Sequence, residues 1–444
     1  MNKLSATSPW ATNLPSKLKV EGFRYSGLKE IEIPGSKSFS NRALIISACA
    51  AGESKLTGLL KSDDTYWCID SLRKSGIKIE ELNGSFNVSG LSGKFQAKEP
   101  LFIGAAGTIA RFLPGVLAST SNQEFQLDSD HTLSRRPILP LLDSLSLLGS
   151  EIVPLDKKGH LPLKIKANGL SNGTINLPGN VSSQYLSGLL ICAPLAKGDI
   201  IINLTTPIVQ PNYVSMTIET MKAFGVNVEV SAKFDKFKVS PQTYKSTDYV
   251  IESDVSSAGY LFALAAIHNL EIEILNLNKN TLQPDIKLLE ILETMGCTYK
   301  LNDNKAIIKG TSKLIGGFEF NLNDFSDQAL TLGCVAPFAD APITISGVSH
   351  IRKHECDRLV ALHEGLKNLQ IKSDVYEDKI VIHPGQPKPA TINTYDDHRV
   401  AMSFSILATK CFGVVIENPS CTAKTFPNFF DVMQKFGTTF SEVK

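Results

Sequence analysis

Two stretches of this 444-residue chain resemble each other closely: SSQYLSGLLICAPLAKGDIIINL at residues 182–204 and FSDQALTLGCVAPFADAPITISGV at residues 325–348. In the first, Leu186, Leu189, Leu190 and Ala193 fall at helical spacing, and the stretch ends in a short apolar run. This order predicts a buried helix followed by a strand. The chain therefore contains a repeated helix–strand unit.

A sixfold repeat becomes visible on either side of these copies. A helix-like segment that leads into an alternating apolar strand recurs at intervals of about 70 residues, a period typical of repeated supersecondary modules. Five copies carry a glycine at the junction, where a helix usually ends in a left-handed residue. The sixth has Gln370, so we expect that helix to end differently. The junctions are LRKSGIKI (Gly76), LSLLGSEI (Gly149), MKAFGVNV (Gly225), LETMGCTY (Gly296), LKNLQIKS (Gln370) and MQKFGTTF (Gly437).

A second helix lies between successive junctions, so each unit reads strand, helix, strand, helix, strand, strand. These helices are expected to begin near Ser40, Gly107, Ser182, Val255, Ser326 and Asp397. The sixth unit runs out at Lys444, and the strand-like segment 17–34 is expected to complete it. The pattern predicts an α/β fold of two similar lobes with three repeats each. One lobe spans residues 35–252 and the other joins residues 1–34 to 253–444, with hinge crossings near Pro34 and Ser253 that favour closure around a ligand.

Composition narrows the class of protein. Lysine plus arginine number 45 against 44 acidic residues, which gives a net charge of +1, and no long run of like charge occurs. This balance argues against nucleic-acid and membrane partners. Apolar residues make up 43%, without a stretch long enough to cross a bilayer or a signal core at the start. Eight scattered cysteines form no C-x-x-C pair, which predicts a cytoplasmic protein without disulfides or structural zinc.

Basic residues stand where local rules disfavour them. Lys37, Arg42, Arg111 and Arg399 lie at or near the starts of expected helices, where the helix dipole repels cations. Such a conflict between local preference and observed residue is typical of function. More cations stand in expected loops: Arg135, Arg136, Arg352, Lys353, Arg358 and Lys424. The sequence therefore predicts one concentrated site for small, multiply anionic ligands at helix N-termini.

Other motifs are weaker. GAAGT at residues 104–108 lacks the spacing of a dinucleotide-binding fingerprint, so no nucleotide site is assigned. His350, His354, Glu355 and Asp357 have the spacing of a helical metal site, but the neighbouring arginines and lysine would repel a cation. No metal or other cofactor is expected. Acid–base chemistry then falls to lysine and carboxylate side chains.

Taken together and in order, several segments resemble the family of 5-enolpyruvylshikimate-3-phosphate synthases along nearly the whole chain. They are PGSKSFSNRAL (34–44), AAGTIARF (105–112), RRP (135–137), VSSQYLSGLL (181–190), SDQALTLG (326–333), RKHECDRL (352–359), DDHRVAM (396–402) and CTAKTFPNFF (421–430). The resemblance implies an inside-out α/β barrel in each of two lobes, with helix N-termini directed at the substrates. It also implies transfer of the enolpyruvyl group of phosphoenolpyruvate to the 5-hydroxyl of shikimate 3-phosphate, with release of phosphate.

Residue roles follow from the same resemblance. Lys37, Asp327 and Glu355 would be catalytic. Shikimate 3-phosphate would contact Lys37, Ser38, Arg42, Ser182, Ser183, Gln184, Gln210, Tyr213, Asp327 and His354, and phosphoenolpyruvate would contact Lys37, Gly107, Arg136, Gln184, Arg358, Arg399 and Lys424. Because a site enclosed between lobes needs no partner chain, a monomer is expected.

Three positions depart from the family pattern, which usually has Asn at Ala105, Ser at Gln210 and Lys at His354. A one-residue shift that brings Lys353 to the ligand would restore the lysine. Two alternatives remain open. One is the related transferase that acts on UDP-N-acetylglucosamine, although residues 69–191 lack the cysteine that its mobile loop uses. The other is a catalytically inactive binding paralogue.

Overall fold

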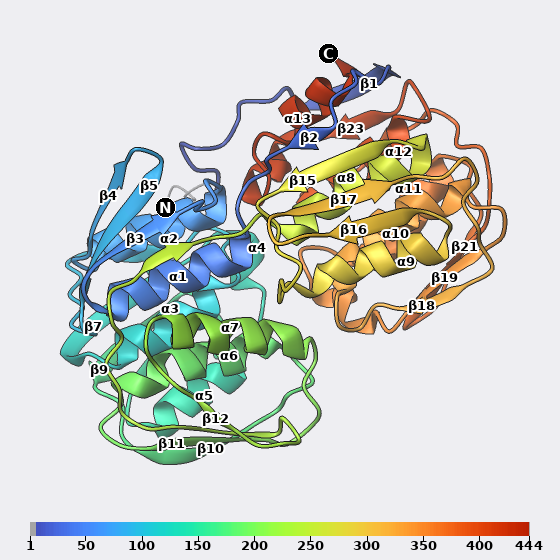
Figure 1. The fold of residues 1–444 in the computed structure, drawn as a ribbon. Helices are drawn as coiled ribbons and strands as arrows, with labels where there is room; N and C mark the ends of the chain where they lie inside the picture. Colours follow the sequence, from blue (N-terminus) through green and yellow to red (C-terminus); the bar gives the residue numbers. More distant parts are fainter. Residues whose placement is uncertain (1–5, 444) are drawn as a thin grey trace. The chain divides into compact units, whose positions relative to one another are not determined.

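The computed structural model describes residues 6–443 and divides them into two units, shown in Figure 1. The first unit comprises residues 6–9 and Gly35–Ile251; the second comprises Trp10–Pro34 and residues 252–443. The start of the chain thus differs from the expected assignment, because residues 6–9 pack on the first unit. Trp67 Nε1 donates to the carbonyl oxygen of Ala6, and the Ser8 amide donates to Asp63 Oδ1 at 2.8 Å.

Six four-stranded sheets form within residues 6–443, one for each predicted repeat, and this confirms the sixfold α/β architecture. In every sheet a first strand runs parallel to a second, and the second pairs antiparallel with a third. A buried inner helix connects the two parallel strands in most repeats, as a parallel crossover requires. The second helix lies between the sheet's second strand and its hairpin strands.

The first unit holds three of these repeats. The first contains α1 (Lys37–Cys49), β3 (Ala51–Thr57), α2 (Asp63–Lys74), β4 (Lys78–Leu82), β5 (Ser85–Leu91) and β14 (Asp248–Val250). The second contains β6 (Leu101–Phe102), α3 (Ile109–Ala118), β7 (Ser121–Asp128), α4 (His131–Ser134), α5 (Leu139–Leu147), β8 (Glu151–Pro154) and β9 (Leu163–Asn168). The third contains β10 (Gly173–Leu177), α6 (Ser183–Cys192), β11 (Ile200–Leu204), α7 (Pro211–Ala223), β12 (Glu229–Val230) and β13 (Lys236–Val239).

The second unit repeats the plan. The fourth repeat contains β2 (Glu30–Ile31), α8 (Val255–His268), β15 (Glu271–Leu275), α9 (Leu288–Thr294), β16 (Thr298–Leu301) and β17 (Lys305–Lys309). The fifth contains β18 (Glu319–Asn321), α10 (Ala329–Val335), β19 (Ile343–Ser346), α11 (Arg358–Asn368), β20 (Ser373–Val375) and β21 (Lys379–Ile382). The sixth contains β22 (Thr391–Ile392), α12 (His398–Ala408), β23 (Val415–Glu417), α13 (Phe429–Phe436), β24 (Thr438–Glu442) and β1 (Lys17–Phe23).

The N-terminal segment takes part in two different sheets. Strand β1 pairs with β23 and β24, so it completes the sixth repeat as predicted. Strand β2, by contrast, runs parallel to β15 in the fourth repeat, and β14 runs parallel to β3 in the first. The two strands that precede α1 and α8 are therefore exchanged, because the chain changes unit directly after each of them.

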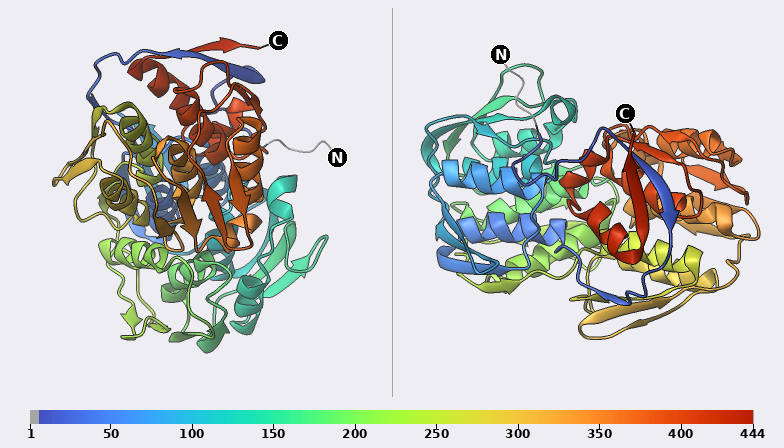
Figure 2. Two further views of the ribbon diagram at one scale, coloured as in Figure 1. Left: turned by 90° about the vertical axis from the view of Figure 1, so that its right-hand side faces the viewer. Right: turned by 90° about the horizontal axis from the view of Figure 1, so that it is seen from above.

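Within each unit the inner helices lie at the centre and the sheets lie on the outside, as Figures 1 and 2 show. Helices α3 and α12 are buried along their whole length, which fits their apolar sequences. Close packing depends on small residues: a Cβ on Gly188 would lie 2.0 Å from the Arg111 carbonyl oxygen. Only glycine lets α6 approach α3 so closely.

The junction glycines adopt the expected left-handed conformation, from Gly76 at a φ of 93° to Gly437 at 106°. The expectation for Gln370 was wrong. It has a φ of 62° and ends α11 in the same left-handed way as the glycines, although a side chain there is strained. The fold thus imposes the same helix end on a residue that does not favour it.

Candidate active site

The predicted residues of the first unit lie at the N-terminal ends of its inner helices. Ser36 caps α1 by accepting from the Phe39 amide, and Lys37 is the first helical residue. Ser182 caps α6 by accepting from the Gln184 amide at 3.3 Å. Arg42 on α1 lies over the Phe112 ring on α3. The Arg111 carbonyl on α3 lies against Gly188 on α6, so the three helices lie close together. Their N-termini offer backbone N–H groups and partial positive charge to an anion.

Lys37 has a buried carboxylate close by. Its Nζ lies 3.6 Å from Asp64 Oδ2 on α2, and the Asp64 side chain is 2% exposed. This negative charge offsets the cost of a lysine at a helix N-terminus. The Lys37 side chain is only 19% exposed, so the pair restricts the position of its ammonium group.

Arg42 joins α1 to the start of α7. Its guanidinium is buried and donates to Thr217 Oγ1 at 2.8 Å, to the Ser38 carbonyl at 3.0 Å and to the Tyr213 carbonyl at 2.8 Å. It also lies over the ring of Phe112, 5.1 Å from the centroid. Burial lowers the pKa of Arg42 to about 10. At least three of its five N–H groups therefore hold the protein together, and they fix the backbone around Ser38 and Tyr213.

Two arginines converge on the loop at Gly107. A Cβ at this glycine would lie 3.0 Å from Arg136 Nη1 and 3.6 Å from Arg111 Nη1. Arg111 donates to the Gly107 carbonyl, and Tyr185 Oη donates to the Pro137 carbonyl at 2.7 Å. These contacts tie the Arg136 loop to α3 and α6, so Gly107 leaves room for a guanidinium that a side chain would obstruct.

Gln210 precedes α7 in a strained conformation. Its φ of 52° lies in the left-handed region, and its carbonyl accepts from the Tyr213 amide. A non-glycine residue there costs free energy, a feature that often accompanies a functional site. The structure thus places Gln210 and Tyr213 at the same end of the unit as Ser38.

In the second unit a buried arginine forms ion pairs with three carboxylates. The Arg358 side chain is 2% exposed, and its guanidinium lies 2.9 Å from Asp327 Oδ1, 2.9 Å from Glu355 Oε2 and 2.8 Å from Asp397 Oδ2. The three acids come from different elements: the 3₁₀ helix Ser326–Gln328, the loop before α11 and the cap of α12. The sequence anticipated two of these acids as site residues and omitted Asp397.

Arg399 and Lys424 complete this cluster. Arg399 Nη2 lies 2.6 Å from Asp327 Oδ2, and Lys424 Nζ lies 2.9 Å from Glu355 Oε1. Asp397 caps α12 by accepting from the Arg399 amide at 2.8 Å. We name these six residues the charge cluster: Asp327, Glu355, Arg358, Asp397, Arg399 and Lys424. Three cations and three carboxylates thus neutralise one another, each within hydrogen-bonding distance of a partner.

Electrostatics within the cluster reflect its burial. Burial alone would lower the pKa of Arg358, but the charges of Asp397 and Glu355 raise it well above its ordinary value. Burial and then the negative charge of Asp327 raise the pKa of the Asp285 carboxyl to about 6. Asp285 accepts a hydrogen bond from Nε2 of Gln328 at 2.9 Å, and Gln328 directly follows Asp327 in the chain. Asp285 is therefore a fourth acid, beside the three of the cluster, and its pKa lies above the usual range.

The structure also separates His354 from Lys353. Arg358 Nη1 lies 3.1 Å from His354 Nδ1, whereas Lys353 is exposed. Because an arginine N–H can only donate, Nδ1 accepts and the ring hydrogen resides on Nε2. His350 contacts Ser326 Oγ at 2.8 Å, and within residues 6–443 no three His, Cys, Asp or Glu side chains form a group suited to a metal ion.

Three acids that sequence reasoning left out of the site are central to it: Asp64, Asp285 and Asp397. The second aspartate of DDHR directly precedes an expected helix, a cap position that could have singled out Asp397. Asp64 and Asp285 carry no comparable local signal. Their importance follows only from burial next to Lys37 and Asp327.

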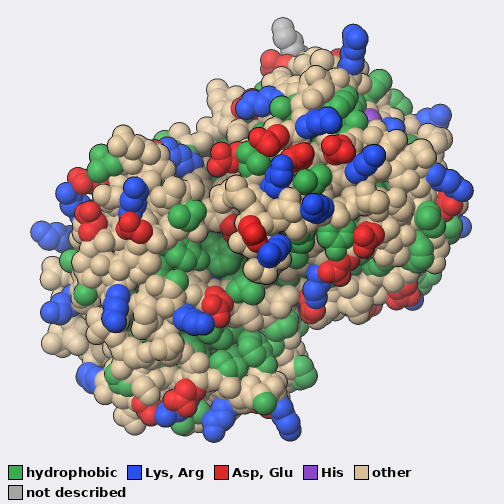
Figure 3. All heavy atoms as spheres, in the orientation of Figure 1, with side chains coloured by type: hydrophobic (Ala, Val, Ile, Leu, Met, Phe, Trp, Pro, Cys, Tyr) green, Lys and Arg blue, Asp and Glu red, His purple; other side chains and the backbone are tan. Residues whose placement is uncertain are grey.

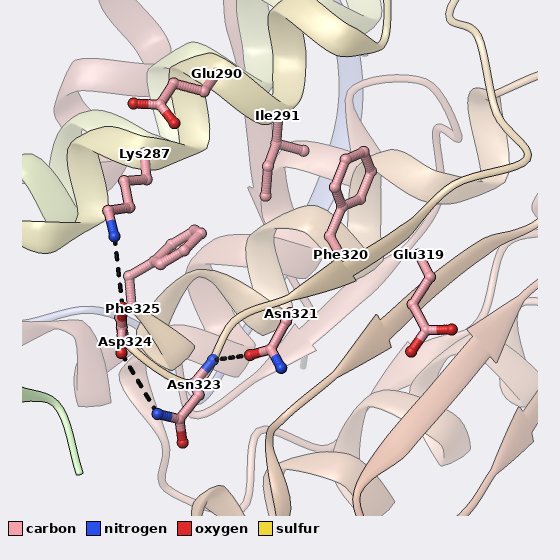
Figure 4. Close-up of a pocket in the computed structure, with 9 residues that line it drawn as sticks. All are labelled: Lys287, Glu290, Ile291, Glu319, Phe320, Asn321, Asn323, Asp324 and Phe325. Atoms are coloured by element: carbon pink, nitrogen blue, oxygen red, sulfur yellow. Dashed lines mark hydrogen bonds and ion pairs between the residues drawn. The ribbon is translucent and has the colours of Figure 1, made fainter. Parts of the chain in front are cut away.

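A separate pocket of about 490 Å³ opens on the second unit (Figure 4). Its apolar walls are Ile291, Phe320 and Phe325, and Lys287 lies 3.5 Å from Asp324 at its rim. None of the predicted site residues lines it. The residues predicted from sequence instead lie in two sets, one in each unit.

Comparison with known proteins shows the family of the chain. The family model described as EPSP synthase (3-phosphoshikimate 1-carboxyvinyltransferase) matches residues 27–433. The chain is 45% identical over 98% of its length to 3-phosphoshikimate 1-carboxyvinyltransferase 2 of Halalkalibacterium halodurans, covering 97% of that protein. It is 38% identical over 92% of its length to the chloroplastic enzyme of Brassica napus, covering 83% of it. An EPSP synthase structure from Acinetobacter baumannii superposes with a TM-score of 0.82 at 25% identity, over 96% of this chain and 99% of the other. The chain belongs to the EPSP synthase family.

Proposed function

We propose that this protein transfers the enolpyruvyl group of phosphoenolpyruvate to the 5-hydroxyl of shikimate 3-phosphate and releases phosphate. Family membership over residues 27–433 supports the reaction class. The charge cluster is the observation that carries the assignment to particular residues. It holds the cations for an anionic substrate and the carboxylates for proton transfer in one place.

Phosphoenolpyruvate is proposed to bind to cations from both units. In the second unit these are Arg358, Arg399 and Lys424, which now pair with carboxylates. The first unit contributes Lys37, Arg136, Gln184 and the backbone at Gly107. Arginine suits this role because its planar fork binds carboxylate and phosphate in a bidentate way.

Shikimate 3-phosphate is proposed to lie mainly against the first unit. The N-terminus of α6 with Ser182, Ser183 and Gln184 would take its phosphate, as helix N-termini do. Lys37, Ser38, Arg42, Gln210 and Tyr213 stand at the starts of α1 and α7. Since Arg42 also holds the Ser38 and Tyr213 backbone, its removal would disturb several contacts at once.

The proposed chemistry has two steps. The 5-hydroxyl oxygen bonds to C2 of phosphoenolpyruvate while Asp327 accepts the hydroxyl proton. In the same step Glu355 or Lys37 gives a proton to C3, which yields a tetrahedral intermediate. The C2–O bond to phosphate then breaks, and C3 returns its proton to Glu355 or Lys37. When an anionic substrate pairs with the three cations of the charge cluster, Asp327 and Glu355 lose these ion-pair partners. Their carboxylates can then accept protons from the substrates. General acid–base groups of this kind typically contribute about 10² to 10⁴ in rate.

Of the departures from the family pattern, His354 has the clearest structural context. It lies beside Arg358, so we propose that its Nε2–H donates to a shikimate hydroxyl in place of the usual lysine. His354→Ala should then weaken shikimate 3-phosphate binding, while Lys353→Ala should leave it unchanged. If Lys353→Ala abolished binding and His354→Ala were harmless, this assignment would be wrong.

The decisive experiment measures phosphate release from phosphoenolpyruvate plus shikimate 3-phosphate. Glu355→Gln and Asp327→Asn should each lower turnover by about 10²-fold or more, with smaller effects on binding. Glu364→Gln is the control, because Glu364 lies on α11 and its ion pair among the described residues is with exposed Lys367. Turnover by Glu355→Gln equal to that of the control would contradict the proposed role.

The same assay separates the alternatives. Replacing shikimate 3-phosphate by UDP-N-acetylglucosamine should give no phosphate release, and an inactive paralogue would release none with either acceptor. Within residues 6–443 no helix combines the length and apolarity needed to span a membrane. Figure 3 shows charges of both signs interspersed on the visible face, in keeping with small anionic partners rather than nucleic acid. We further propose that the protein is cytoplasmic and monomeric; light scattering tests the oligomeric state, and cell fractionation tests the location.

A further inference from the structure

The chain passes between the two units three times, once more than the repeat pattern implies. It leaves the first unit after Pro9, returns at Gly35 and leaves again after Ile251. The last two passages run side by side, because the Asp254 amide donates to the Pro34 carbonyl and Ser253 Oγ reaches the Ile33 carbonyl. Two adjacent passages behave as one hinge. The passage at residues 9–10 uses other elements.

On the first unit, this passage is anchored at the start of α2. The Ser8 amide donates to Asp63 Oδ1 at 2.8 Å, and the next residue, Asp64, pairs with Lys37. Trp67 Nε1 donates to the Ala6 carbonyl at 2.7 Å. The Trp67 ring in turn fills the space where a Cβ on Gly104 would lie, 2.3 Å from Cδ1. The anchor therefore contacts the residue next to the partner of Lys37, and it holds Trp67 against the loop that leads to Gly107.

On the second unit, the anchor is the segment around Lys424. Thr12 Oγ1 donates to the Pro427 carbonyl at 2.8 Å, and Ser420 Oγ reaches the Leu14 carbonyl at 3.4 Å. The Asn418 amide donates to the Ser16 carbonyl at 2.8 Å. These contacts lie on both sides of Lys424. Residues 12–16 thus brace the segment that carries one cation of the charge cluster.

Only four residue steps separate the Ser8 and Thr12 anchors. A fully extended chain spans at most about 3.6 Å per residue, so the two anchor points can stand no more than about 14 Å apart while both contacts persist. Proline at position 9 further restricts the backbone. This connection is short enough to limit motion about the hinge.

We propose that residues 6–16 are a positioning segment, which tethers α2 to the Lys424 segment and limits how far the two units separate when no substrate is bound. It keeps the Lys37 and Lys424 half-sites within reach of the same ligand. Because the two units then stay closer together before the substrate binds, less conformational freedom is lost on binding, and the affinity for the substrate is higher. The effect on substrate affinity rests on the proposed function, whereas the effect on separation does not.

The test lengthens the tether. Six Gly and Ser residues inserted between Pro9 and Trp10 raise its maximum span from about 14 Å to about 36 Å. Small-angle scattering of the protein without substrate should show a larger radius of gyration than the unmodified chain. Shikimate 3-phosphate should bind more weakly, by at most about fourfold. That limit is the −3/2 power of tether length for a linker acting alone, and the hinge passages still join the units. Turnover at saturation should stay within about twofold, a split that general misfolding would not produce.

Two further variants keep the result interpretable. The same insertion at the exposed Asn83–Gly84 turn controls for added length and should change neither radius nor affinity. Ser8→Pro removes the amide donor to Asp63 without lengthening the chain, and it should shift the radius in the same direction as the tether insertion. If the tether insertion and Ser8→Pro both left radius and affinity at the control values, the positioning role would be refuted. Absence of any turnover in the unmodified protein would refute the proposed function instead, while scattering would still test the tether.

Discussion

Asp397 offers the sharpest test of the charge cluster, because its side chain is fully buried and nearly isosteric with asparagine. It accepts from Arg358 Nε at 2.8 Å and from the Arg399 amide at 2.8 Å. Asp397→Asn would leave three cations facing two carboxylates without changing the packing. Removing one partner of a buried ion pair typically costs about 3–5 kcal/mol. We therefore expect the free energy of unfolding to fall by about this amount.

Urea unfolding followed by circular dichroism measures this loss, with the transition of each unit fitted separately because a two-unit chain need not unfold in one step. Glu151→Gln is the matched control. Its ion pair with Lys166 has a similar length, 2.7 Å, but both side chains are about half exposed. This control should not move either midpoint measurably. Equal midpoints for Asp397→Asn and Glu151→Gln would refute the reasoning that the cluster depends on buried charge balance.

Three further predictions concern single positions. Between about pH 4 and pH 6 the folded state keeps a proton on Asp285, whose pKa is raised, while the unfolded chain has lost it. The free energy of unfolding should therefore decrease as pH rises through this window. Asp285→Asn should abolish that decrease in thermal melts at successive pH values. Gln370→Gly should raise the free energy of unfolding by about 1 kcal/mol by relieving a left-handed side-chain residue, and no gain would contradict the strain. Gly188→Ala should destabilise by about 1–3 kcal/mol, since its methyl group would meet the Arg111 carbonyl; unchanged melting would show that α6 can shift.

Features that depend on neighbouring residues could be predicted from the sequence alone. Helix ends, caps and strand order depend on neighbouring residues, so the glycine junctions at Gly76 and Gly437 and the pairing of β1 with the last repeat were predicted correctly. Cations at helix starts marked Lys37 and Arg399 for the same reason: a conflict with the helix dipole is visible within one turn. The family resemblance supplied the reaction, and the comparisons confirmed the family.

Tertiary structure decided what depends on contacts between distant segments. Asp397 meets Arg358 across 39 residues of chain, and β2 pairs with β15 rather than with the sheet that follows it. Gln370 adopts a glycine-like conformation because the repeat around it fixes the end of α11. The passage at residues 9–10 is equally invisible in local patterns. In each case the free energy comes from burial and pairing across the fold, which no short window of sequence encodes.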